Sequence, residues 1–249
     1  MRQMVLFITM VATFAAFAAR AADTYLPVPV TISNSVDVPG HLEKLLVELR
    51  LAAGKNDLDA VLSHVSSDFF WDGDHGGGYD AMKTAQDNFS SALSLDPKRV
   101  KPEHRADLWL AFNALVDART ASAHPGKQGV ICLPGKGKLA NETDAEKTAD
   151  GFGVDPWYGM VFAVGRPVAV REAPKSASPI VGKIHNEAVI VRLKLKSDPD
   201  ATWEPVQLSD GVAGWVPSQQ VQTFLDAQLC FAKGSNETWK IVGYNGGGD

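Results

Sequence analysis

The side chains best placed to do chemistry lie in one glycine-rich stretch, which holds Asp72, Asp74 and His75. Two carboxylates and an imidazole suit a divalent cation. A calcium-binding EF-hand loop, however, needs an oxygen ligand and a glutamate where the chain has Gly76 and Lys83. A phosphate-binding loop would need a Gly-Lys-Ser/Thr ending, which is also missing. Two interpretations remain, a small-anion or metal site and a tight turn into a helix, and we favour the turn.

The cysteines and histidines of the chain indicate neither a cysteine nucleophile nor a zinc site. Cys132 lies in an apolar run with only His185 after it, and no histidine follows Cys230. A cysteine nucleophile needs a histidine base, so this pattern argues against a papain-like peptidase. The six histidines show no His-Glu-x-x-His spacing. We therefore predict no enzyme, no metal site and no cofactor, although a pair of distant carboxylates could still form a glycosidase site.

The first 22 residues have the three parts of a secretory signal. Arg2 provides a positive charge, residues 4–18 are apolar, and Ala19-Arg20-Ala21 fits a cleavage site. The apolar run is too short for a membrane helix. We expect a periplasmic or secreted protein with no membrane span in the mature chain.

Charge excludes one class of partner. Removing Arg2 and Arg20 leaves 22 basic against 29 acidic residues, a formal charge of −7. No dense cluster of Lys and Arg is present to follow a phosphate backbone. Nucleic acid is therefore not expected as a partner.

The chain has two cysteines, Cys132 and Cys230. In an oxidising compartment an even number of cysteines tends to pair, so we predict a disulfide between them, with two separate buried thiols as the alternative. The bridge would fasten the C-terminal segment to the first half of the chain.

Helical periodicity dominates the first half of the chain. Leucines at 42, 45, 46 and 49 form one apolar stripe that Gly54 should end. A short helix should follow, then a third over residues 79–95 that buries Met82 and Phe89, and a fourth that begins at Pro102. Residues 23–38 mix proline with β-branched residues, which favours an extended arm.

A β-pattern occupies the next part of the chain, from about 157 to 222. Short alternating runs such as Val168/Val170 and Val206/Leu208 are separated by proline, glycine and Asp-Gly turns. The order Val-x-Val-Arg-x-Ala-Pro, then Val-Gly-Lys-Ile, then Trp-x-x-Val-x-Leu-x-Asp-Gly-x-x-Gly-Trp-Val resembles the bacterial SH3-like (SH3b) domain over residues 166–216. The resemblance implies an antiparallel β-barrel that binds cell-wall peptides or related envelope ligands.

These patterns combine into an α+β fold. We expect a signal peptide at 1–22, a helical or α+β domain at 23–134, and a linker at 135–156. The SH3-like barrel at 157–222 is followed by a C-terminal β-hairpin at 223–249 that packs back on the N-terminal domain. The final run Trp-Lys-Ile-Val-Gly-Tyr resembles the closing strand of exported proteins that carry such a barrel inside a host domain.

Alternation within the barrel selects a candidate binding site. If Val170 and Val216 point inward, Arg171 and Trp215 point outward, and with Asp210 they would line a peptide-sized groove. The alternative is packing, with Arg171 paired to a nearby carboxylate and Trp215 against the helical domain. We predict a non-enzymatic envelope module that binds a cell-wall peptide or an envelope protein. The alternatives are an enzyme with a pocket near Asp72, Asp74 and His75, and a barrel that docks only within its own chain.

Overall fold

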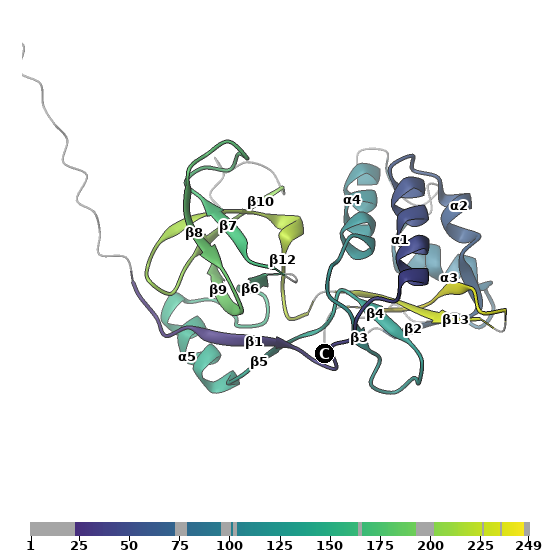
Figure 1. The fold of residues 1–249 in the computed structure, drawn as a ribbon, viewed down its shortest axis with the longest axis horizontal. Coiled ribbons are helices and arrows are strands. Elements are labelled where there is room, and N and C mark those ends of the chain that lie inside the picture. The colour runs from purple at the N-terminus through teal and green to yellow at the C-terminus, as the bar shows by residue number, and fades with distance from the viewer. Residues whose placement is uncertain are drawn as a thin grey trace, which may run out of the picture.

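The computed structural model describes residues 23–72, 79–95, 101, 104–163, 166–192, 202–225, 227–234 and 236–246. The signal-peptide prediction at 1–22 lies outside this range. The described chain forms two lobes that lie side by side (Figure 1). The helical lobe combines helices α1–α4 with a five-stranded sheet, and the sheet lobe combines a nine-stranded sheet with helix α5. The protein is thus a mixed helix and sheet fold.

The helices of the described chain follow local sequence signals. They are α1 (Gly40–Ala53), α2 (Leu58–Leu62), α3 (Ala85–Ala92), α4 (Arg105–Val116) and α5 (Glu142–Phe152). The leucine stripe of α1 is buried, as predicted, and α1 ends before Gly54. The side chains of Asp57, Thr84 and Asn141 accept hydrogen bonds from the first turns of α2, α3 and α5, which stabilises each helix start.

The third helix is shorter than its apolar pattern predicts, because side-chain hydrogen bonds hold residues 80–84 in a turn. The amide of Asn88, itself buried, accepts from Asp80 N at 2.7 Å and donates to Asp80 O at 3.0 Å. Thr84 then caps the helix by accepting from Asp87 N at 3.1 Å. Met82 therefore lies on the turn and is 94% exposed rather than buried.

The five-stranded sheet joins the front of the chain to its end. Its strand order is β2 (Val65–Asp72), β14 (Trp239–Asn245), β13 (Gln228–Lys233), β4 (Ile131–Leu133) and β3 (Ser122–Ala123). The β13–β14 hairpin pairs with β4 on one side and, in parallel, with β2 on the other. The C-terminal strands thus complete the sheet of the helical lobe.

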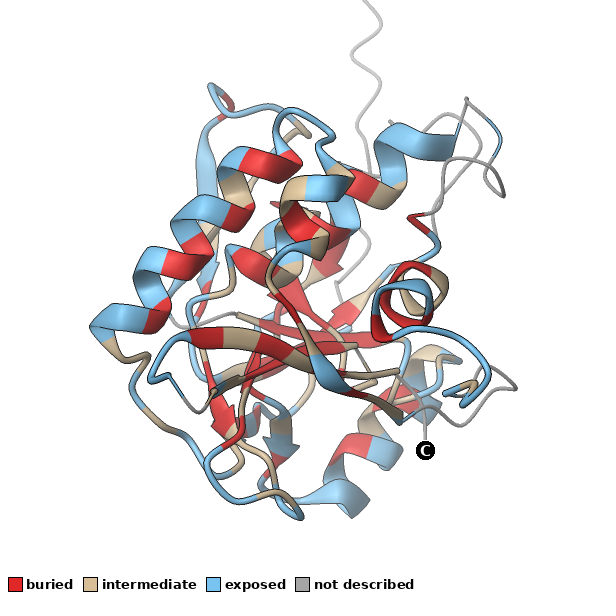
Figure 2. Ribbon diagram, turned by 90° about the vertical axis from the view of Figure 1, so that its right-hand side faces the viewer, coloured by how far each residue is buried: buried red, intermediate tan, exposed pale blue. Residues whose placement is uncertain are grey.

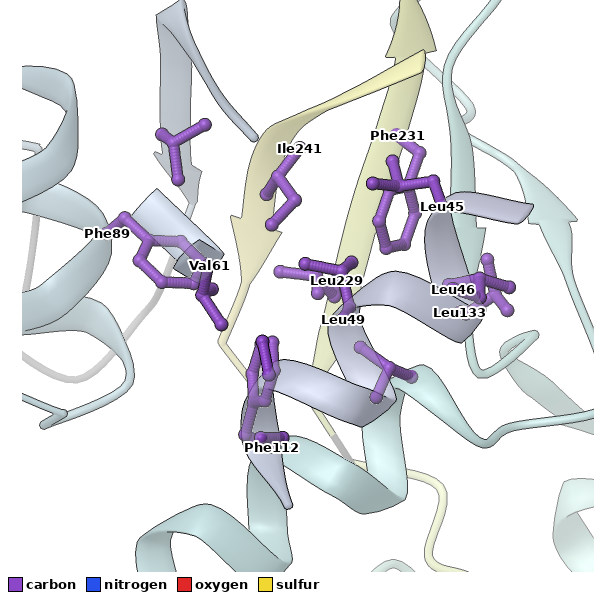
Figure 3. Close-up of a cluster of buried hydrophobic side chains, with 14 of the residues drawn as sticks. Leu45, Leu46, Leu49, Val61, Phe89, Phe112, Leu133, Leu229, Phe231 and Ile241 are labelled. Atoms are coloured by element: carbon purple, nitrogen blue, oxygen red, sulfur yellow. The ribbon is translucent and has the colours of Figure 1, made fainter. Parts of the chain in front are cut away.

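Helices cover one face of this sheet, and their buried residues repeat on the side that faces it (Figure 2). The core lies between the two layers (Figure 3). It includes Leu45, Leu46, Leu49, Val61, Phe89, Phe112, Leu133, Leu229, Phe231 and Ile241. Phe89 packs edge-on against Phe69 and Phe112.

The other face of this sheet carries the predicted disulfide, which the structure confirms. Cys132 and Cys230 lie directly opposite each other on β4 and β13, and both are buried. Phe70 packs beside them, over Gly243. A β-carbon at Gly243 would collide with that ring, so the ring requires a glycine there.

The nine-stranded sheet of the sheet lobe is antiparallel and curls on itself. Its main path is β12 (Val221–Gln222), β6 (Met160–Ala163), β9 (Glu187–Val191), β10 (Trp203–Gln207), β11 (Ala213–Pro217), β7 (Val168–Arg171) and β8 (Ile180–Ile184). Strands β1 (Val28–Ile32) and β5 (Gly137–Leu139) join it beside β9. Inside the curl, alternate residues form a valine-rich core that includes Val168, Val170, Val206 and Val216.

The interpretation of residues 135–156 as a linker is wrong, because β5 and α5 form there. Ala145 and Ala149 are fully buried against β1, β6 and β9. Gly153 ends the helix in the left-handed conformation, with φ 67°. In the sequence of α5 the buried residues are alanines that alternate with charged residues, so no apolar stripe predicts a helix. Their small side chains let the helix approach the sheet closely. The segment predicted as an extended arm is extended, and its residues Val28–Ile32 form β1, which pairs with β5 and β9.

Candidate binding face on the curled sheet

The structure brings two of the three predicted site residues together. Arg171, the last residue of β7, lies directly opposite Trp215 on β11. Directly opposite residues on neighbouring strands point to the same face of a sheet. Pro205 on β10 lies opposite Trp215, and Ile180 on β8 lies opposite Arg171. One row of side chains therefore crosses four strands.

This row lies on the outer face of the sheet. Val170 and Val216 are fully buried inside the curl, so alternation points Arg171 and Trp215 the other way. Trp215 is half-buried and Ile180 is 54% exposed. Neither residue belongs to any of the buried clusters of the described chain.

A second tryptophan lies beside the row. Trp203 pairs with Pro217, two residues along from the Pro205–Trp215 pair, and so shares the outer face. It is half-buried and belongs to none of the buried clusters. We call the surface formed by Arg171, Ile180, Trp203 and Trp215 the Trp215 face; Pro205 belongs to the same side of the sheet but is buried.

The rest of the outer face is covered by other parts of the chain. Met160, Phe162 and Ile190 on β6 and β9 pack under α5 and β1. Tyr25 covers the next row, where its hydroxyl donates to Gln207 O at 2.8 Å and accepts from Ile190 N at 3.3 Å. Burial raises the pKa of Tyr25 well above its usual range. The Trp215 face thus adjoins a covered surface.

Arg171 makes a contact that the sequence did not predict. Its Nη1 donates to Ser178 O at 2.7 Å, while Ser178 Oγ accepts from Ala173 N at 2.9 Å. The expected alternative, a pair with Glu172 or Asp210, does not form. One guanidinium nitrogen therefore holds the β7–β8 turn, and no carboxylate of the described chain pairs with the group.

Asp210 has a different position from the one predicted. It lies in the turn between β10 and β11, where its Oδ1 accepts from Val212 N at 3.0 Å. The backbone N–H of Tyr25 donates to O of the neighbouring Ser209 at 3.0 Å, so this turn lies beside the N-terminal segment. Asp210 thus stabilises a turn and is not part of the Arg171–Trp215 row.

Sequence reasoning missed Trp203, Pro205 and Ile180 on this side of the sheet. The signal was present for two of them, because alternation along β10 puts Trp203 and Pro205 on the face opposite Val206, although Pro205 is itself buried. Ile180 gave no such signal. A bulge between Val170 and Arg171 shifts the register, so that Ile180 rather than Val181 lies opposite Arg171.

The alternative site near residue 72 is only partly described. Asp74 and His75 lie outside the described residues. Asp72 ends β2 with its side chain 60% exposed, and its Oδ2 lies 4.0 Å from Nε2 of His124. Burial, with a smaller effect of Lys127, lowers the pKa of His124. Within the described ranges, no group of three or more His, Cys, Asp or Glu side chains is arranged to hold a metal ion.

Comparison of the chain with protein-family models and with curated proteins gives no match. None of the helices in the described part of the chain is long and apolar enough to cross a membrane.

Proposed function

We propose that this protein is an exported, non-enzymatic binding module of the cell envelope, and that the sheet lobe is an SH3-like barrel that recognises a cell-wall peptide or an envelope protein. The observation that carries the proposal is the outward-facing row in which half-exposed Trp215 lies directly opposite Arg171. The resemblance of residues 166–216 to SH3b domains supports the same assignment.

The chemistry of the Trp215 face suits an extended peptide. Trp203 and Trp215 offer flat apolar surfaces on neighbouring strands, and tryptophan is enriched at the centres of binding sites because it buries a large area with few rotatable bonds. Arg171 keeps guanidinium N–H groups beyond the one that binds Ser178 O, and these can pair with a ligand carboxylate. The ligand we propose is therefore a peptide with a free carboxylate.

The compartment is supported by the disulfide. The Cys132–Cys230 bridge is closed and buried, and such bridges persist in oxidising compartments such as the periplasm or the exterior. A periplasmic or secreted location therefore fits the structure, together with the signal predicted at residues 1–22.

Sedimentation with insoluble peptidoglycan tests the proposal. The wild-type chain should sediment with the cell wall, and Trp215→Ala and Arg171→Gln should remain in the supernatant. Tyr158→Ala is the matched control, because Tyr158 is an aromatic residue of the same lobe, 60% exposed, just before β6 and away from the Trp215 face. Failure of the wild type to sediment, or equal sedimentation of all four proteins, would count against this function.

A further inference from the structure

A cleft separate from the Trp215 face lies between the two lobes. Its volume is about 550 Å³, which is in the usual range of small-molecule sites, about 300–1,000 Å³. The helical lobe contributes the end of α3, the α4 surface and the segment after α4. The sheet lobe contributes Arg166, Val168 and residues 218–222. No residue of the Trp215 face lines it.

One wall of the cleft is apolar. Leu93 from the end of α3 and Leu108 and Leu115 from α4 are half-buried and line it. Val168 of β7 lies on the side of the sheet lobe. An apolar group of several carbons would find aliphatic contacts on both lobes.

Two arginines give the cleft a positive charge. Arg119, just after α4, and Arg166, before β7, both line it and are exposed. In the described part of the chain neither has a carboxylate partner. Asp117 also lines the cleft, but it lies 3.5 Å from Arg50 of α1. Two unpaired guanidinium groups in an acidic protein favour an anionic ligand.

A buried amide oxygen adds a second requirement. Gln222 lines the cleft and is only 5% exposed. Its Nε2 donates to Gly135 O at 3.3 Å, and because that oxygen can only accept, this bond identifies the amide nitrogen. Its Oε1 has no hydrogen-bond partner. This oxygen has almost no accessible surface, so a ligand reaches it only when the Gln222 side chain turns. A buried acceptor without a partner is costly, and a ligand N–H donor that meets the turned amide would remove that cost.

We propose that this cleft binds a small organic acid with an apolar chain and an N–H donor, and that N-acyl amino acids are its ligand class. The carboxylate pairs with Arg119 and Arg166, and the amide N–H donates to Oε1 of a Gln222 side chain turned towards the cleft. The acyl chain lies along Leu108 and Leu115. This site is independent of the Trp215 face, so either proposal can fail without the other.

The test is an NMR titration of the full, disulfide-bonded chain labelled with ¹⁵N. The probe is N-octanoyl-L-leucine, and its carboxamide, N-octanoyl-L-leucinamide, is the matched ligand without the charge. We expect saturable shifts at Leu108, Ala118 and Gln222. The carboxamide should bind about tenfold more weakly, since a hydrogen bond to a charged group is worth at least that factor.

Single variants test whether Arg119 and Arg166 bind the carboxylate of the ligand. Arg119→Gln and Arg166→Gln should each weaken binding of the acid about tenfold and leave binding of the carboxamide unchanged. Arg192→Gln is the charge-matched control, because Arg192 is exposed, follows β9 and does not line the cleft. Well-dispersed spectra of each variant show that it folds.

The role of Gln222 needs a double comparison. N-octanoyl-N-methyl-leucine lacks the amide N–H and should bind wild type more weakly than the parent acid does. In Gln222→Met, which removes the acceptor at similar size, the two acids should bind equally. The proposal is overturned if the acid gives no shifts in the cleft at millimolar concentrations, if acid and carboxamide bind alike, or if the shifts map to the Trp215 face.

Discussion

Removing the disulfide should lower the free energy of unfolding of the helical lobe by about 3–5 kcal/mol. Cys132 and Cys230 are 98 residues apart. If the whole loop is flexible after unfolding, loop-closure entropy gives about 4.7 kcal/mol at 25 °C.

The lower value, about 3 kcal/mol, applies if the sheet lobe, which lies inside that loop, stays folded. If the sheet lobe stays folded, its own structure holds residues 137 and 222 in place. The flexible part is then only the short segments from β4 to β5 and from β12 to β13. A closed loop of about 15 residues is worth about 3 kcal/mol. The measured value therefore also reports whether the lobes unfold together.

The assay is urea unfolding of wild type and of the Cys132→Ala/Cys230→Ala double variant, followed by circular dichroism and tryptophan fluorescence. Wild type in the presence of a thiol reductant provides a second comparison without mutation. Amide exchange in β13 and β14 should speed up in both disulfide-free forms, because β13 carries Cys230 and β14 pairs with β13. A loss below about 1 kcal/mol would refute the loop argument.

Three further results are expected. Gly243→Ala should cost about 1–3 kcal/mol in thermal or urea unfolding, because the new methyl group must displace the Phe70 ring; an unchanged midpoint would show that this ring moves freely. Burial raises the pKa of Tyr25, so the unfolded chain loses that proton first and stability should fall as pH rises above about 10; Tyr25→Phe should abolish this part of the loss. Burial lowers the pKa values of His64 and His124, so the unfolded chain takes up protons first and stability should fall as pH drops below about 6.5. Imidazole NMR titration giving ordinary pKa values for both would contradict that expectation.

Strong local periodicity made part of this fold predictable. Leu42, Leu45, Leu46 and Leu49 of α1 form one stripe and are all buried, because one stripe of a helix must face a core whatever the partner is. The two cysteines were predictable as a pair because an even number of cysteines behind a predicted secretory signal tends to bridge. The alternation that points Trp215 outward is equally local.

What failed depended on interactions that a hydropathy pattern does not show. Helix α5 is held by alanines whose value lies in close approach to a sheet, and no hydropathy pattern shows that. Asn88 holds a turn that the apolar pattern continued as helix. Asp210 was grouped with Arg171 and Trp215 as a polar end of one groove, but its turn lies beside Tyr25, whose backbone N–H donates to Ser209 O. The interlobe cleft joins residues 92–134 with residues 166–244, and so no local pattern predicts it.

The most direct test of the central claim is the tryptophan indole NMR spectrum of the full chain during titration with a soluble cell-wall peptide. The account predicts saturable shifts of the Trp215 and Trp203 indole signals, while Trp109, buried in the helical lobe, stays unchanged. Saturable binding that leaves both Trp215 and Trp203 unmoved, or no binding at all, would contradict it.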